Sequence, residues 1–264
     1  MSRRVIPTLA LGVALSCISF AACNATAGVP IRLTLALESL SVADVTTPTG
    51  WDVHLDEAVV LLGPIYAYAP IEEGMAALTG SARRILAPPI ARAHGGFDPL
   101  MHRIVRAEYL EQFAFDALSP DVVTVGEIDG LLGAVDELSV VLDAPLDANE
   151  LASGPTHAHH LWVHGTATRE DRTISFEGGL DLEDVDLTRR VDGIGVDGPA
   201  LNDGATLVVG VDPTLWLAEA DFTALAEGGD AVVIDPESQP HRAWRLGART
   251  SAAYAARTME GPTP

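Results

Sequence analysis

The feature that most constrains this chain's fold is a recurring alternation of apolar and other residues with a period of two. It is clearest in residues 31–38, where every second position is apolar: Ile31, Leu33, Leu35 and Leu37. Successive side chains of a β-strand point to opposite faces, so the pattern predicts a strand with one buried face. Residues 51–62 repeat it, from Trp51 into an apolar run that Gly63-Pro64 is expected to end, and 65–68 is expected to form a further short strand.

Further strands are expected at 122–125, 138–142, 160–168, 173–180 and 207–211, with a hairpin turn at 169–171 and a turn region at 126–133. The pattern of 104–118 fits either a helix or a bent strand. Residues 71–104 are interrupted by Pro88-Pro89 and Gly95-Gly96, which predicts a long irregular loop. The tail from 244 to 259 has a helical composition. The chain therefore fits a mainly β fold, an antiparallel β-sandwich or barrel-like domain with one long irregular loop and a short C-terminal helix.

The first residues have the composition of an export signal. A basic head with Arg3 and Arg4 precedes an apolar run from Val5 to Phe20. Two cleavage sites compete, a lipobox that would leave Cys23 as a lipidated first residue and an ordinary signal-peptidase site at 25–27. The expected organisation is a signal peptide at 1–23, a tether at 24–30, a single domain at 31–259 and a disordered tail at 260–264. By resemblance to bacterial lipoproteins, Asn24 after the cysteine suggests an outer-membrane destination.

Charge excludes several classes of partner. The chain has 37 acidic residues against 16 basic ones, a net charge of −21. Such a field repels phosphate backbones and anionic lipid surfaces, so we expect no nucleic-acid binding and membrane contact only through the lipid anchor. Cys17 would be lost with the signal, so no internal disulfide is expected. The partners that this charge leaves possible are a protein of the cell envelope and a metal ion.

A family resemblance covers most of the expected mature chain. It lies in Gly50-Trp51-Asp52-Val53-His54-Leu55, in Leu62-Gly63-Pro64-Ile65-Tyr66 and in Phe176-Glu177-Gly178-Gly179-Leu180. These stretches resemble uncharacterised bacterial lipoproteins. The resemblance implies an exported β-rich domain with histidines in its loops, and it implies no reaction and no catalytic residue.

Residues 156–164 contain four of the eight histidines of the chain. Imidazole is the commonest transition-metal ligand, and histidines two apart on an extended chain share a face. His157 and His159 have this spacing, and His160 could join them where the strand begins. The irregular loop offers His94, His102 and Asp98 as further ligands. The residue types predict a site for Cu or Zn. His164, His54 and His241 are expected to take no part.

Three other readings remain open. The first is an envelope protein-interaction module whose histidines bind no metal, and the second is a metal-dependent hydrolase that uses the same histidines. The chain lacks the nucleophile-elbow, His-Glu-x-x-His and phosphate-loop motifs, so a non-enzymatic role is favoured. The third is a calcium site in the acidic stretch 181–186, for which a solvated strand edge is the simpler explanation.

Overall fold

The structure is a computed structural model that describes residues 28–41, 43–70, 97–98, 103–143, 156–182, 189–226 and 230–261. The predictions for the signal peptide, Cys23, His94 and His102 lie outside these residues. The chain is mainly β, as predicted. Its strands are β1 (Pro30–Ser39), β2 (Asp44–Thr46), β3 (Asp52–Tyr68), β4 (Phe97–Asp98), β5 (Arg103–Tyr109), β6 (Phe113–Asp116), β7 (Val123–Leu131), β8 (Glu137–Leu142), β9 (Leu161–Arg169), β10 (Arg172–Leu180), β11 (Arg190–Asp197), β12 (Thr206–Val211), β13 (Val232–Val233) and β14 (Tyr254–Met259). The helices are α5 (Thr214–Leu217), α6 (Gln239–Gly247) and the 3₁₀ turn η1 (Ser251–Ala253).

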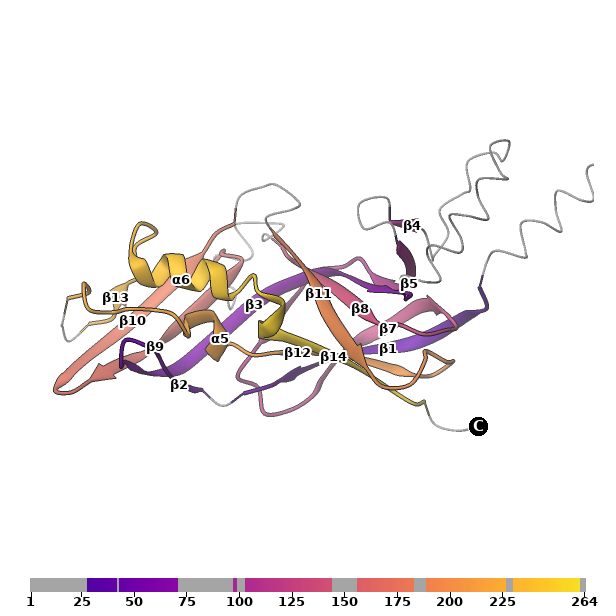
Figure 1. The fold of residues 1–264 in the computed structure, drawn as a ribbon, viewed down its shortest axis with the longest axis horizontal. Helices are drawn as coiled ribbons and strands as arrows, with labels where there is room; N and C mark the ends of the chain where they lie inside the picture. The colour runs from indigo at the N-terminus through magenta and orange to yellow at the C-terminus, as the bar shows by residue number, and fades with distance from the viewer. Residues whose placement is uncertain are drawn as a thin grey trace, which may run out of the picture.

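The long strand β3 joins the two halves of an elongated molecule (Figure 1). In one half the sheet closes on itself in the order β3, β8, β11, β14, β12, β1, β7 and β5, and β5 pairs again with β3. This closure agrees with the barrel-like form of the prediction. Most neighbours are antiparallel, but β1–β12 and β11–β14 are parallel. Arg103, 4 % exposed, strengthens the closure because it binds the Ala69 carbonyl oxygen and the carboxylates of Asp136 and Glu137.

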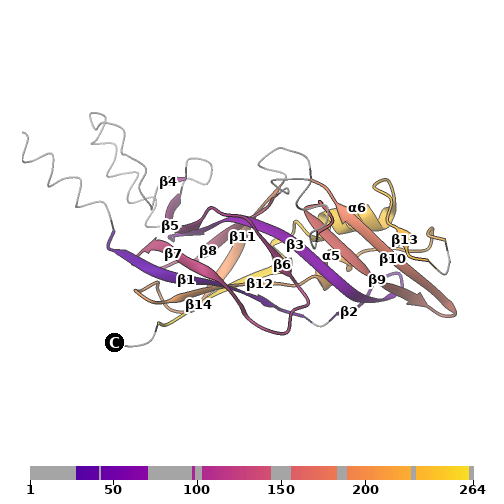
Figure 2. The ribbon, with the colours of Figure 1, turned by 180° about the vertical axis from the view of Figure 1, so that it is seen from behind.

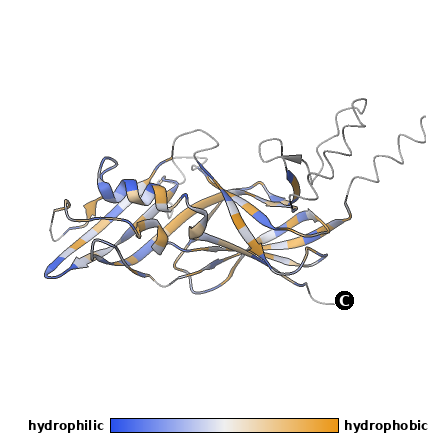
Figure 3. Ribbon diagram, viewed as in Figure 1, coloured by the Kyte–Doolittle hydropathy of each residue, from blue (hydrophilic) through white to orange (hydrophobic). Residues whose placement is uncertain are grey.

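In the other half the beginning of β3 pairs with β2 on one side and with β9 on the other, and β10 and β13 extend the sheet. Alternating hydrophobic and hydrophilic residues mark these strands in Figure 3. Trp51 and Phe176 are fully buried on the inner face, where both rings contact Phe222. The chain from α5 to α6 covers this inner face, as Figures 1 and 2 show from opposite sides. The outer face carries the histidines of β3 and β9.

The strands β3 and β7 both continue through positions where the sequence predicted an end or a turn. Gly63-Pro64 was expected to stop a strand, yet β3 continues through it to Tyr68 because β8 pairs with β3 both before and after a register shift between Leu62 and Ile65. Glycine is required there, since a Cβ at residue 63 would lie 2.1 Å from the Glu111 carbonyl oxygen. The expected turn at 126–133 is also wrong, because β7 runs to Leu131 along β1.

The C-terminal tail differs from the expectation in its extent. The helix is α6, which begins after Ser238, and the Ser238 side chain accepts a hydrogen bond from the His241 backbone N–H. Residues 254–259 form β14 instead of helix, because Tyr254, Ala256 and Thr258 alternate into the interior while the strand pairs with β12. The open choice for 104–118 resolves as the two strands β5 and β6. Among the described residues, no helix has the length and apolar character needed to cross a membrane.

Candidate functional site

The histidine stretch forms a tight turn that leads into β9. His157 and Ala158 have φ angles of 49° and 69°, in the left-handed region that non-glycine residues rarely adopt. The His159 N–H closes the turn by donating to the Thr156 carbonyl oxygen at 2.9 Å. Left-handed non-glycine residues concentrate at functional sites, and here they form the turn that precedes β9.

His160 is fixed beneath the surface between two strands. Its N–H donates to the Leu180 carbonyl oxygen at 3.1 Å, and its own carbonyl oxygen accepts from the Leu61 N–H at 2.9 Å. The residue is 4 % exposed. Its Nδ1 lies 3.4 Å from Oδ1 of Asp181, and its buried Nε2 has no hydrogen-bond partner among the described residues. An unpartnered buried ring nitrogen is costly, so it calls for an explanation.

His159 reaches the same carboxylate from the outer face. Its Nδ1 lies 2.9 Å from Oδ2 of Asp181. The ring lies directly over Gly179 of β10, where an added Cβ would come within 2.0 Å of the His159 Cδ2. It is also stacked with Trp162, with ring centroids 6.0 Å apart and an interplanar angle of 15°. Gly179, Trp162 and Asp181 together define the position of this imidazole.

His157 occupies a different place from the other two. Its ring centroid is 4.1 Å from that of Trp162, and this contact is separate from the carboxylate shared by His159 and His160. The structure thus brings together His159 and His160 through Asp181, and it places His157 against the indole that His159 also contacts. His164 lies further along β9, 3.7 Å from Asp56.

Asp181 was not among the predicted ligands, although the sequence contains the signal for it. A hairpin with its turn at 169–171 was predicted, and in the observed register Leu161 lies opposite Leu180, so the residue before β9 must lie near the residue after β10. That register alone brings 160 and 181 together. The acidic stretch 181–186, for which a solvated strand edge was favoured over a calcium site, begins with this aspartate, and its residues 183–186 lie outside the described part of the chain.

Burial controls the charge of His160. Loss of water contact lowers the pKa of His160 below its ordinary value, and the nearby Arg189 guanidinium lowers it further, while Asp181 and Asp143 oppose the shift. A lowered pKa keeps the imidazole neutral near neutral pH. Neutral imidazole is the form that binds a metal ion.

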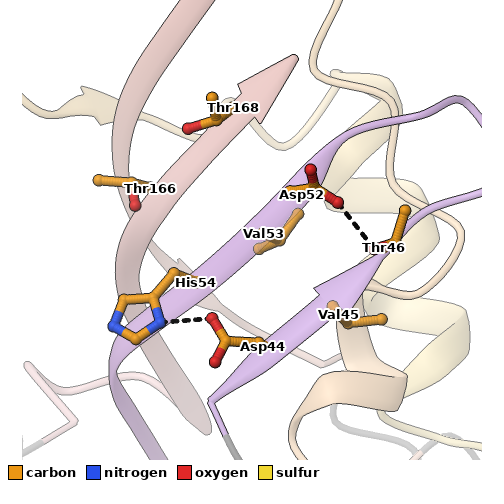
Figure 4. A pocket seen from close by; sticks show the side chains of 8 residues that line it. All are labelled: Asp44, Val45, Thr46, Asp52, Val53, His54, Thr166 and Thr168. Atoms are coloured by element: carbon orange, nitrogen blue, oxygen red, sulfur yellow. Dashed lines mark hydrogen bonds and ion pairs between the residues drawn. The ribbon is translucent and has the colours of Figure 1, made fainter. Parts of the chain in front are cut away.

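A second histidine–carboxylate group lies on the outer face at β2 and β3 (Figure 4). His54 Nδ1 is 2.7 Å from Asp44 Oδ1, and its Nε2 is 3.7 Å from Asp56 Oδ1. The group borders an open depression of about 380 Å³, which is lined by Asp44, Val45, Thr46, Asp52, Val53, His54, Thr166 and Thr168. Val53 is buried, but the other lining residues are partly or fully exposed, so the depression lacks the enclosure typical of a small-molecule site.

No group of three or more histidine, cysteine, aspartate or glutamate side chains is arranged to hold a metal ion within the described residues. A complete coordination sphere would therefore need water or residues from outside the described ranges, where the predicted ligands His94 and His102 lie. The described residues supply two imidazoles, those of His159 and His160, which both contact the Asp181 carboxylate.

Comparison with known proteins identifies no family. No protein-family model matches the chain, and no curated protein matches it. One solved structure, MbnP from Methylosinus trichosporium, aligns with 88 % of this chain and 99 % of its own, at 9 % identity and a TM-score of 0.39. A likeness at this level supports no statement about function, which must be argued from the site itself.

Proposed function

We propose that this protein binds one divalent transition-metal ion, Cu(II) or Zn(II), through His159 and His160. The observation that carries the proposal is the Asp181 carboxylate, whose two oxygens contact the Nδ1 atoms of both imidazoles. The protein would capture or deliver the ion outside the cytoplasm, held to the membrane by a lipid on Cys23.

The carboxylate explains how the imidazoles would be set for a metal. Metal-bound histidines usually donate the other ring N–H to a carboxylate or carbonyl group, which fixes the ring and makes the ligating nitrogen more basic. Asp181 would take this part at Nδ1 of His159, which leaves Nε2 as the ligating atom of that ring. The Leu182 backbone N–H also donates to Nδ1 of His160 at 3.5 Å, so the proposal requires the His160 tautomer in which Nδ1 carries the proton toward Asp181 and Nε2 ligates. The buried Nε2 of His160 fits this role, since no hydrogen-bond partner for it is found in the described part of the chain.

The remaining ligands would be water and imidazoles such as His94 or His102 from the predicted loop. A water molecule among the ligands would leave a position at which an incoming or receiving group can exchange the ion. Capture or delivery is therefore favoured over a purely structural ion.

Calorimetric titration of the metal-stripped protein with Cu(II) and with Zn(II) tests the proposal. The expected result is one ion per chain, with affinity reduced at least ~100-fold in a His159→Ala/His160→Ala variant, since imidazoles would supply the principal ligands. Asp181→Asn should cost about 10-fold to 100-fold, as expected when an orienting carboxylate is removed.

The matched control is His54→Ala/His164→Ala, which removes two imidazoles that also contact a carboxylate. This variant should bind the ion as the parent does. Because His160 is buried, its replacement could disturb the fold, so the thermal unfolding of every variant is measured together with its metal affinity. The single variant His159→Ala changes only the partly exposed imidazole. Equal loss in both double variants, or no binding by the parent, would remove the proposal.

A further inference from the structure

The C-terminal segment has a charge opposite to that of the whole molecule. The chain carries 37 acidic residues against 16 basic ones, yet Ser238 to Met259 contains four arginines and no aspartate or glutamate. Three of these arginines, Arg242, Arg245 and Arg249, belong to α6 and the turn that follows it. The surface of α6 is therefore a basic region on an acidic protein.

These arginines share one face of the helix. Positions 242, 245, 246 and 249 follow the spacing of neighbours along one side of a helix, and Arg242, Arg245 and Leu246 are exposed. The opposite side buries Pro240, His241, Ala243 and Trp244. Leu246 is 68 % exposed, so a large apolar side chain lies in the middle of the basic face. Figure 3 shows this mixture of hydrophilic and hydrophobic residues on α6.

Helix stability accounts for only part of this arrangement. Arg245 lies in the last turn, where a cation interacts favourably with the helix dipole. Arg242 is earlier, and it donates to the Glu237 carbonyl oxygen. Within the described residues, Arg245 has no ion-pair partner and the buried Nε of Arg249 has no hydrogen-bond partner. Neither the helix dipole nor packing explains the exposed Leu246.

We propose that the outer face of α6, formed by Arg242, Arg245 and Leu246 with the partly buried Arg249 at its end, docks an acidic segment of a partner protein. The net negative field repels such a segment from the rest of the surface, so this face would both attract the partner and set its orientation. Arginine is enriched at protein interfaces, and Leu246 supplies the apolar contact that phosphate or a sugar backbone would not use.

The docking face lies on the other side of β10 from the His159 ring, although Asp181 also acts electrostatically on His241 of α6. A Cβ added at Gly178 of β10 would meet Ile234 and Trp244 on the α6 side, whereas one added at the next residue, Gly179, would meet the His159 ring on the outer face. The two surfaces therefore occupy opposite sides of β10. Each can be tested without the other.

The test measures binding of a fluorescein-labelled peptide of alternating glutamate and leucine to the metal-free full chain by fluorescence anisotropy. The comparison peptide contains lysine in place of glutamate. We expect the acidic peptide to bind at low salt and the basic one not to bind at this face. Arg245→Glu should weaken acidic-peptide binding by about fivefold, the scale of an exposed ion pair. Leu246→Ser should weaken it by a similar factor of about five, because it removes the apolar contact at the centre of the face.

Arg32→Glu is the matched control, because the Arg32 side chain is 71 % exposed on β1, and it should leave peptide binding unchanged. The proposal fails if Arg32→Glu weakens binding as much as Arg245→Glu. It also fails if duplex DNA or phosphatidylglycerol vesicles bind more tightly than the peptide in an Arg245-dependent manner, or if sedimentation shows that Arg245 mediates self-association. The metal titration of Arg245→Glu should match that of the parent.

Discussion

At the scale of single residues, Gly179 decides where His159 can lie. The imidazole lies on the β10 backbone because residue 179 has no side chain, and a Cβ there would approach the ring to 2.0 Å. We predict that Gly179→Ala moves the His159 ring away from Asp181 and lowers metal affinity by about 10-fold, the lower end of the cost of losing an orienting contact. Titration with Cu(II) or Zn(II) measures the change.

The same substitution should have little effect on folding. The His159 side chain is 33 % exposed and can swing into solvent, so we expect the free energy of unfolding to change by less than about 1 kcal/mol. Gly195→Ala on β11 is the matched control, since a Cβ there meets nothing within 4 Å. Unchanged metal affinity in Gly179→Ala would mean that His159 is not a ligand in the position seen here.

At the scale of elements, alternation predicts strands well where one face is buried. β1 and the β9–β10 hairpin have regular inward and outward positions, and both were predicted within a few residues. The prediction failed where glycine or proline lies inside a paired strand, as at Gly63 and in β7. Local conformational preference favours a turn at such positions, but pairing with neighbouring strands outweighs it. Those pairings join distant parts of the chain, so they cannot be predicted from the local spacing of apolar residues.

The candidate site also has a part that the sequence predicts and a part that it does not. The sequence placed His157, His159 and His160 at a junction between loop and strand, because four histidines in nine residues stand out in any chain. Asp181 is an ordinary aspartate in an acidic protein, and only the hairpin register gives it a role. The contacts of His157 and His159 with Trp162 depend on two left-handed residues, which composition does not predict.

The packing of α6 should make stability depend on pH through His241. This residue is 7 % exposed, and burial lowers its pKa below the ordinary value of 6.5, with a further lowering by Arg245 and opposition from Asp181 and Asp235. The unfolded chain then binds more protons than the folded chain between the lowered and the ordinary pKa. The contribution of the neutral His241 imidazole to the free energy of unfolding is complete above pH 6.5. It is lost as the pH falls through that value toward the lowered pKa.

We therefore predict that the free energy of unfolding falls between about pH 7.5 and about pH 5, and that it falls less in His241→Gln. The substitution itself should cost about 1–2 kcal/mol at the higher pH, because it replaces a buried ring. Urea unfolding of the parent and of His241→Gln across this pH range measures the two free energies of unfolding. Titration of the other charged groups affects both proteins alike, so the difference between the curves reports His241. Parallel curves, or a His241 imidazole that titrates at or above 6.5 by NMR, would contradict the prediction.

At the scale of the whole molecule, net charge opposes the compact state. The net charge of −21 repels itself across the surface, and among the described residues the ion pairs that offset it range from exposed ones, such as Arg32 with Glu127, to partly buried ones, such as Arg103 with Glu137. Exposed pairs contribute little each, about 0–1 kcal/mol, so they cannot compensate for so large an excess. The stability of the fold rests on its hydrophobic core, which is continuous through both halves.

Salt should therefore stabilise this protein. Raising NaCl from about 10 mM to about 500 mM shortens the screening length to well below the size of the molecule and removes most of the self-repulsion. The exposed ion pairs weaken as well, but their loss is smaller than this gain. We predict that the melting temperature rises by about 2–4 °C, the shift expected for ~1 kcal/mol in a chain of this size. Scanning calorimetry in NaCl measures it, with sucrose of equal osmolality as the uncharged control. A melting temperature that stays constant or falls with NaCl would show that like-charge repulsion is not a significant cost in this fold.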